Sequence, residues 1–182
     1  MSLKLIVKSL AWRRVTRRYP YEPHPVPEDF RGKVEFDPDA CMGCGACANV
    51  CPPNAIEVIE RPGEGVRVIK LFIGRCIFCG RCEENCPVAA VRQTDEFELA
   101  SRSREDLEVL LKHVLAVDGE GHVMEYTERE LAEAMELLAT FEDRELVRKL
   151  GEYARMCRSC RVREGVNSIV KSLRPGLGGG EG

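Results

Sequence analysis

The sequence predicts an α+β protein with a pseudo-twofold core, flanked by an N-terminal helix and strap and by a helical C-terminal extension. Three observations support this prediction. The four-cysteine pattern of residues 41–51 recurs at residues 76–86 with a constant offset of 35 (76 − 41 = 35). Short β-branched runs accompany both copies, and apolar residues at helical spacing fill much of the rest. A chain of 182 residues suits one domain with extensions rather than two full domains.

Residues 1–18 predict a basic amphipathic docking helix. Its main apolar positions fall on one helical face: Leu3, Ile6, Val7 and Leu10. Such a helix can lie on an anionic membrane surface or dock into a groove of another subunit. Lys4 and Lys8 interrupt the apolar run that a signal peptide needs, and no window approaches the length of a transmembrane helix. We therefore expect a cytoplasmic protein, in a compartment where thiols stay reduced.

Residues 19–33 contain four prolines within "YPYEPHPVPEDFRG" and predict an extended strap. Residues 34–94 form the predicted core domain. Four segments there predict short strands: "KVEF", "AIEVIE", "VRVIKLFI" and "AAVRQT". Pro62, Gly63 and Gly65 predict a turn between the middle two.

Residues 95–173 predict a helical extension, and the glycine-rich residues 174–182 predict a disordered tail. Three pairs with capping-box spacing indicate where its helices begin: Ser103 with Asp106, Thr127 with Glu130, and Thr140 with Asp143. Apolar residues at helical spacing follow each pair, and the third helix runs toward Cys157.

The duplicated cysteine pattern, C-x2-C-x2-C-x3-C-P, is the spacing that ligates cubane iron–sulfur clusters in two-cluster bacterial ferredoxins. In such a pattern three cysteines of one run bind one cluster, and the fourth binds the neighbouring cluster. The sequence therefore predicts two [4Fe–4S] clusters on a bacterial ferredoxin-like core. The first would be held by Cys41, Cys44, Cys47 and Cys86, and the second by Cys76, Cys79, Cys82 and Cys51.

Two other uses of eight cysteines fit less well. Zinc sites usually come as two separated C-x2-C pairs rather than as four cysteines within eleven residues. A disulfide framework contradicts a reducing compartment. The eight cysteines thus predict an electron carrier, and nothing in the sequence resembles a catalytic nucleophile, an acid–base pair or a nucleotide-binding loop.

The chain also resembles a known family. Its "VTRRYPYEPHPVPEDFRGK", the first cysteine run, "GRCIFCGRCEENCPVAAV" and "EFELASRSREDL" resemble the TYKY-type two-cluster subunit of complex I and of membrane-bound, energy-converting [NiFe] hydrogenases and formate hydrogenlyases. The resemblance spans residues 15 to 107. It implies a non-catalytic relay subunit whose partners include a [NiFe]-hydrogenase-like catalytic subunit and membrane-arm subunits. It also implies a peripheral position at the cytoplasmic face of the membrane, with the N-terminal helix along the membrane arm.

Two rival functions stay open on the sequence. The nearer is the equivalent subunit of a complex I-like quinone reductase or of a related sulfur-reducing complex, against which the C-terminal extension argues. The farther is an iron–sulfur sensor or regulator, which would need a nucleic-acid or effector surface. The only candidate is the N-terminal stretch of residues 1–33, with a charge of +5 (8 − 3). It has few recognition-helix features, so we expect no nucleic-acid partner.

Cys157 and Cys160 lie outside the duplicated pattern. The hydrogenase-type relatives of the resemblance carry a C-x2-C pair here together with an earlier cysteine group, where this chain has "VLAVDGEGHVMEY". One interpretation is a zinc or iron site, which two of three polar residues would complete: Asp118, His122 and His113. A second is a degenerate site whose thiols are buried or meet a partner. Redox catalysis lacks the strand–helix context that it requires.

Overall fold

The computed structural model describes residues 3–12, 16–22 and 25–173, with the side chains of residues 171–173 left undescribed. The chain divides into a smaller unit, Met1–Phe30, and a larger unit, Arg31–Gly182. The predicted disordered tail, residues 174–182, lies outside the described residues.

The smaller unit contains one helix, α1 (Leu3–Ala11), among its described residues. The helix ends earlier than the predicted segment of residues 1–18. Its apolar side chains are exposed, including Leu3 and Leu10. The Lys8 ammonium lies 6.0 Å from the ring centroid of Trp12, which extends the same surface. Residues 16–22 and 25–30 form turns and irregular segments, as the prolines predict.

The four strands predicted in the core are confirmed. They are β1 (Val34–Phe36), β2 (Ile56–Arg61), β3 (Val66–Phe72) and β4 (Val91–Gln93). A short 3-10 turn at Pro62–Glu64 joins β2 to β3, where proline and glycine predicted a turn. β1 pairs with β4, and β2 pairs with β3, both antiparallel. Two helices of four residues each, α2 (Ala46–Asn49) and α3 (Arg81–Glu84), carry the cysteine runs.

The strand registers repeat with the offset of the cysteines. Val34 pairs with Gln93, and the residues 35 positions away, Ile69 and Val58, also pair. Backbone torsions repeat as well. The three residue pairs with positive φ at this offset are Gly43 and Phe78, Gly45 and Gly80, and Asn54 and Ala89. Since side chains with a Cβ rarely adopt positive φ, these matches show that both copies of the sequence fold along the same local path.

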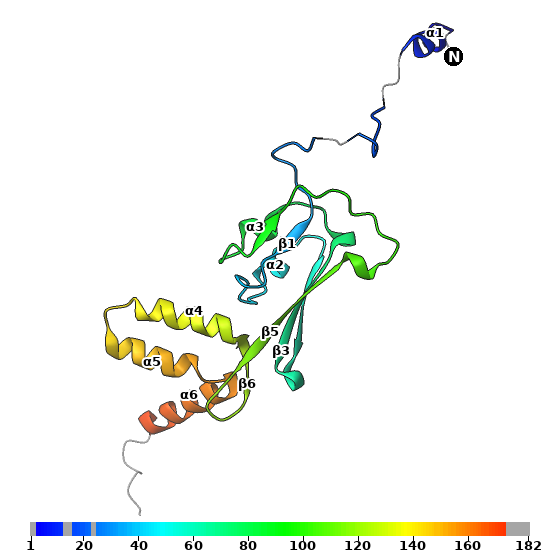
Figure 1. The fold of residues 1–182 in the computed structure, drawn as a ribbon. Coiled ribbons are helices and arrows are strands. Elements are labelled where there is room, and N and C mark those ends of the chain that lie inside the picture. Colours follow the sequence, from blue (N-terminus) through cyan, green and yellow to red (C-terminus); the bar gives the residue numbers. More distant parts are fainter. Residues whose placement is uncertain (1–2, 13–15, 23–24, 174–182) are drawn as a thin grey trace, which may run out of the picture. The chain divides into compact units, whose positions relative to one another are not determined.

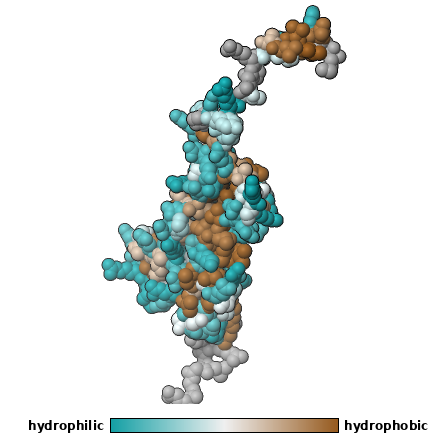
Figure 2. All heavy atoms as spheres, turned by 45° about the vertical axis from the view of Figure 1, so that its right-hand side comes forward, coloured by the Kyte–Doolittle hydropathy of each residue, from teal (hydrophilic) through white to brown (hydrophobic). Residues whose placement is uncertain are grey.

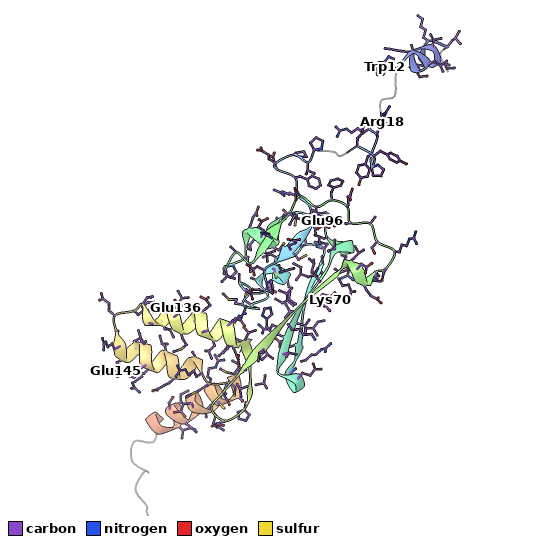
Figure 3. All side chains as sticks on the ribbon, in the orientation of Figure 1. Trp12, Arg18, Lys70, Glu96, Glu136 and Glu145 are labelled. Carbon is purple, nitrogen blue, oxygen red and sulfur yellow. The ribbon has the colours of Figure 1, made fainter. Side chains whose placement is uncertain are left out.

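The prediction of a helix after Ser103 is wrong. A short 3-10 turn (Glu105–Leu107) leads into a long strand, β5 (Glu108–Val117), which turns back as β6 (Val123–Thr127). β5 pairs with the whole of β3, and Lys70 of β3 (labelled in Figure 3) bonds Glu108 at 2.7 Å. The same leucine and valine residues that have helical spacing also alternate between buried and exposed along this strand. The open edge of β3 therefore decided the outcome, because pairing there satisfies a row of backbone groups.

The rest of the extension is helical, as predicted. Its helices are α4 (Glu128–Ala139), α5 (Arg144–Ala154) and α6 (Arg158–Leu173). The Thr127–Glu130 capping box begins α4, as predicted. Asp143 rather than Thr140 caps α5, since its carboxylate accepts the N–H groups of Glu145 and Leu146.

The larger unit thus has a four-stranded antiparallel sheet of order β2-β3-β5-β6 and a separate β1–β4 pair. Figure 1 shows β3 and β5 as the long central strands, with α4 and α5 side by side near the β6 end. Among the described residues, none of the helices combines the length and apolar character needed to span a bilayer.

Candidate metal centres

The first cysteine run, residues 41–51, is called the first loop. Three of its cysteines line one cavity together with a cysteine of the second run: Cys41, Cys44, Cys47 and Cys86. Ile69 and Val91 complete the apolar wall of this cavity. The non-atom space, open solvent included, is about 270 Å³.

The second run, residues 76–86, is called the second loop. Its first three cysteines line another cavity together with the last cysteine of the first loop: Cys76, Cys79, Cys82 and Cys51. Leu71, Ile56 and Ala55 form the apolar wall, and the space, again with open solvent, is about 340 Å³. Each cavity therefore brings together the crossed set of four cysteines that the spacing predicts.

Both loops take the same course because glycine begins their helices. Gly45 and Gly80 are left-handed, with φ of 74° and 79°, and they precede α2 and α3. The crossing cysteines are held alike, since Ala55 N–H donates to Cys51 Sγ and Ala90 N–H donates to Cys86 Sγ, both at 3.2 Å. Backbone donors of this kind stabilise a thiolate once it binds iron.

Burial raises the pKa of two cysteines in each set. Burial, followed by the neighbouring thiols Cys41 and Cys44, raises the pKa of Cys47 to about 12. Burial raises the pKa of Cys82 to about 11, although the backbone N–H of Glu83 opposes the change. Burial likewise raises the pKa of Cys41 and Cys76. Four thiolates so close together require cations, and the donor set fits iron clusters that bind by displacing protons.

The C-terminal extension contacts the first loop through groups that lie outside the cysteine motif. Thr127 donates its hydroxyl to Met42 O. Arg129 donates to three carbonyls that precede or begin the loop: Pro38 (2.8 Å), Asp39 (2.8 Å) and Cys41 (3.1 Å). His113 packs against Gly43, where an added Cβ would lie 2.8 Å from the imidazole. No spacing rule links residues 42 and 127, so only the fold reveals this contact.

Arg67 of β3 also bonds the first loop. Its buried guanidinium donates to Gly43 O at 3.0 Å, to Glu130 at 3.0 Å and to Glu60 at 2.7 Å, and it also bonds Glu125 O. Burial, followed by the charges of Arg129 and Arg67, lowers the pKa of His113, which keeps that ring neutral at pH 7. The first loop therefore lies beside two guanidinium groups and a neutral imidazole.

The second loop is less covered within the larger unit. Arg31 donates to Cys79 O at 2.9 Å. The Ile77 side chain, at the position of Met42 in the repeat, is 60% exposed. Gln93 lies beside Gly80, within 2.9 Å of where a Cβ would be.

Two buried nitrogens beside the loops support the fit to clusters. Among the described residues, His113 Nε2 and Gln93 Nε2 are buried and have no hydrogen-bond partner. One belongs to a side chain that contacts the first loop, and the other to a side chain that contacts the second loop. Buried N–H donors normally find an acceptor, and the sulfur atoms of a cluster are acceptors.

The cysteines outside the repeat also meet polar partners. The ligand atoms of four residues all lie within 4.8 Å of one another: Asp118, His122, Cys157 and Cys160. His113, offered by the sequence as another member, lies against Gly43 instead. Burial opposes ionisation of Asp118, yet hydrogen bonds from the His122 N–H and from Cys157 lower its pKa. The Cys157 contact raises the pKa of Cys160 to about 12.

Comparisons with known proteins agree with this geometry. A model of the 4Fe-4S dicluster domain matches residues 40–90. Formate hydrogenlyase subunit 6 of Escherichia coli (strain K12) is 46% identical over 101 residues, which are 56% of each chain. The match thus spans just over half the length of that relative. F(420)H(2) dehydrogenase subunit I of Methanosarcina mazei is 41% identical over 34% of each chain.

A further relative is covered almost completely. NADH-quinone oxidoreductase subunit I 2 of Geobacter metallireducens is 38% identical over 122 residues, which are 62% of this chain and 92% of the relative. A chain of the membrane-bound sulfane sulfur reductase, an archaeal respiratory membrane complex, is 30% identical over 59% of each chain, with a TM-score of 0.44. The present chain therefore belongs to the TYKY-type family of 4Fe-4S dicluster subunits that includes NADH-quinone oxidoreductase subunit I.

Proposed function

We propose that the chain binds two [4Fe–4S] clusters and passes single electrons between them within a membrane-bound oxidoreductase complex. One observation carries the proposal: each of two cavities is lined by three cysteines of one run and the crossing cysteine of the other. Crossed ligation would give the core its pseudo-twofold layout and hold the clusters close enough for electron transfer. The clusters supply the redox chemistry, and the chain supplies thiolates, backbone donors and an apolar wall.

The chain's own residues would set the properties of each cluster. Apolar side chains between the cavities, such as Ile69 and Leu71, are 1% exposed and exclude water. Arg129 places positive charge beside the first loop, which favours its reduced and more negative cluster, whereas the charge of Arg67 is offset by Glu60 and Glu130. We infer no catalytic residue, because electrons would enter and leave through neighbouring subunits.

The relatives suggest what those neighbours are. We infer a hydrogenase-type complex, with a [NiFe]-hydrogenase-like catalytic subunit and membrane-arm subunits, because formate hydrogenlyase subunit 6 is 46% identical. A quinone reductase is the second candidate. It is favoured by the subunit I relative, of which 92% is covered. The C-terminal extension has three helices after β6. If these helices contact a subunit that only one of the two complexes contains, that contact distinguishes the two candidates.

Exposed apolar surface supports a place in an assembly. Figure 2 shows apolar atoms gathered on α1 and, separately, over part of the larger unit. The exposed apolar side chains of α4, α5 and α6 include Leu137, Leu150, Tyr153 and Val162, and Phe141 between α4 and α5 is also exposed. Exposed apolar patches of this kind mark interaction sites. We propose that α1, whose apolar residues are exposed, holds the chain at the cytoplasmic face of the membrane.

Anoxic affinity purification from detergent-solubilised membranes tests the proposal. We expect about eight irons per chain, a cluster signal on reduction, and co-purification with a hydrogenase-like large subunit and membrane subunits. Recovery with a quinone-reducing arm would select the second candidate. Recovery of the chain alone from the soluble fraction, with clusters bound, would refute the relay role within a complex.

A further inference from the structure

The second group of cysteines lies where two separate segments meet. The turn between β5 and β6 supplies Asp118 and His122, and the start of α6 supplies Cys157 and Cys160. The two segments are far apart in the sequence, since Cys160 Sγ contacts the carboxylate of Asp118, which lies 42 positions earlier. Both cysteines are buried, at 4% and 7% exposure, and so is Asp118. A small apolar cluster around Met124 and Ala116 surrounds them.

Four of the six distances among the ligand atoms are close to those of tetrahedral coordination, and the other two, both at Cys157 Sγ, are within 4.8 Å. A tetrahedron with metal–sulfur distances of about 2.3 Å and metal–nitrogen or metal–oxygen distances of about 2.0 Å has edges of about 3.3–3.8 Å. His122 Nδ1 lies 3.9 Å from Cys157 Sγ and 3.7 Å from Cys160 Sγ. Asp118 Oδ2 lies 3.4 Å from Cys160 Sγ and 3.2 Å from His122 Nδ1. These edges need only small adjustments to accept an ion.

The turn positions its two ligands before any ion binds. Asp118 Oδ1 accepts the N–H groups of Glu120 (2.9 Å) and His122 (2.8 Å). The other oxygen, Oδ2, is thereby directed toward the thiols. Gly121, at φ 86°, lets the chain turn sharply enough to bring residue 122 beside residue 118. One carboxylate oxygen therefore shapes the turn, and the other is available as a ligand.

The helix start positions the other two ligands. Cys157 directly precedes α6, and Cys160 N–H donates to Cys157 Sγ at 3.4 Å. This is the N-cap arrangement, in which the first N–H groups of a helix point toward the side chain that precedes it. Arg163 lies 3.6 Å from Cys160 Sγ and bonds Glu120 at the rim. This ion pair closes the rim of the site beside Cys160.

The rival interpretations explain less of this geometry. Thiols that meet a partner protein should be accessible, whereas both cysteines are buried. Thiols that only fill a core have no need of a buried carboxylate and an imidazole within 4.8 Å. Buried charges in proteins are paired or bind metals, and among the described residues Asp118 Oδ2 faces the His122 ring and the Cys160 thiol, which are themselves metal-ligand types, rather than a Lys or Arg.

We propose that Asp118, His122, Cys157 and Cys160 bind one zinc ion that fastens the β5–β6 turn to the start of α6. Zinc suits two thiolates, an imidazole and a carboxylate in tetrahedral geometry, and four protein ligands make the site structural. The small core around Met124 is separate from the main core, and a bound ion would add stability where apolar burial is limited.

The ion would also stabilise the cover over the first loop. β6 runs directly from the turn to Thr127, whose hydroxyl bonds Met42 O. Arg129 follows in α4 and bonds Cys41 O at 3.1 Å. A rigid turn thus keeps these contacts in place, and the second loop receives none of them. This consequence rests on the proposed function of the loops, whereas zinc binding does not.

Metal analysis of the full chain, purified anoxically with its clusters, tests the site. We expect about one zinc per chain beside the irons. Zinc-edge X-ray absorption should show two sulfur neighbours at about 2.3 Å and two nitrogen or oxygen neighbours at about 2.0–2.1 Å. The absence of zinc, or a zinc shell without sulfur, would overturn the proposal.

Matched variants locate the ion. His122→Ala removes an exposed side chain, so the fold should survive while zinc affinity falls at least tenfold. His122→Cys should keep the zinc with three sulfur neighbours. Arg158→Gln is the control, because Arg158 lies between the two cysteines but its exposed side chain pairs with Glu125, and this variant should keep the wild-type shell. If His122→Ala holds zinc as tightly as Arg158→Gln, the assignment is wrong.

Hydrogen exchange tests the link to the first loop. His122→Ala should speed exchange in residues 118–127 and 38–43 but not in residues 76–82. If zinc binds but His122→Ala does not speed exchange in this pattern, the proposed link between the zinc site and the first loop is overturned. A variant with Cys86→Ser, which should lose the first cluster, is expected to retain its zinc. Failure of the proposed cluster function is therefore distinguishable from failure of the zinc site.

Discussion

The first and second loops have the same cysteine spacing and the same left-handed glycines, yet they lie in different surroundings. The first loop is bonded by Arg67, Thr127 and Arg129, which come from β3, β6 and α4. The second loop receives one bond from Arg31 and leaves Ile77 exposed. The difference shows that a duplicated motif can hold two equivalent sets of ligands while sequence outside the repeat makes their environments unequal.

The largest expected effect is the loss of one cluster. Cys86→Ser, in the second loop, should remove the same cluster as Cys41→Ser, because both cysteines line one cavity. Iron should fall from about eight to about four per chain, and the two variants should retain the same electron paramagnetic resonance signal on reduction. Cys51→Ser should instead match Cys76→Ser. If Cys86→Ser behaves like Cys76→Ser, crossed ligation is refuted.

Removing the support beneath the first loop should cost stability. Arg67→Met leaves Glu130 and Gly43 O without their buried partner, a loss of about 3 kcal/mol and a fall in Tm of about 6–12 °C. Arg75→Met is the matched control. It breaks a bond to Glu57 between side chains that are about half exposed, so it should cost less than about 1 kcal/mol. If the two variants lose equal stability in anoxic melting curves, the comparison between the buried support of Arg67 and the exposed bond of Arg75 is contradicted.

The cluster-free protein should lose stability as pH rises. The pKa of Cys47, about 12, and of Cys82, about 11, lie above the ordinary 9.0. A raised pKa means that the folded state holds the proton more tightly, so this contribution is complete below pH 9 and lost toward pH 11–12. Both thiols are partly screened, so we expect a loss of about 1 kcal/mol in urea unfolding between about pH 8.5 and 10.5.

Two variants sharpen that pH dependence. Cys47→Ala should flatten the curve more than Cys82→Ala, because the pKa of Cys47 is raised further. If stability instead rises with pH, burial does not control the pKa of these thiols. Circular dichroism follows the unfolding of all three proteins.

The smallest expected effect is on the cluster potentials. The first cluster should have the higher potential, because the Arg129 guanidinium bonds three carbonyls at its loop. Arg129→Gln should lower that potential by tens of millivolts and leave the second unchanged. Arg31→Gln, which removes the bond to Cys79 O, should lower the potential of the second cluster and leave the first unchanged. Redox titration followed by electron paramagnetic resonance measures both, and equal shifts of the two signals would refute separate control.

Local rules predicted the parts that depend on neighbouring residues. The β-branched segments around the cysteines are strands, the Pro62–Gly65 turn joins two of them, and the Thr127–Glu130 box begins a helix. Each of these rests on short-range sterics or hydrogen bonds. The segment after Ser103 was predicted wrongly because its apolar spacing suits a helix or a strand, and pairing with β3 decided between them.

By itself the sequence determined the duplication, the chemistry of eight thiols and the crossed grouping, because spacing in a short loop limits which cysteines can share a cluster. Only the tertiary structure decided which remote groups meet: Arg129 with Cys41 O, and Asp118 and His122 with the last two cysteines. It also separated His113 from that group and placed it against Gly43. Contacts across 80 or 90 positions leave no periodic signal, because they arise when strand pairing and helix packing bring distant segments together.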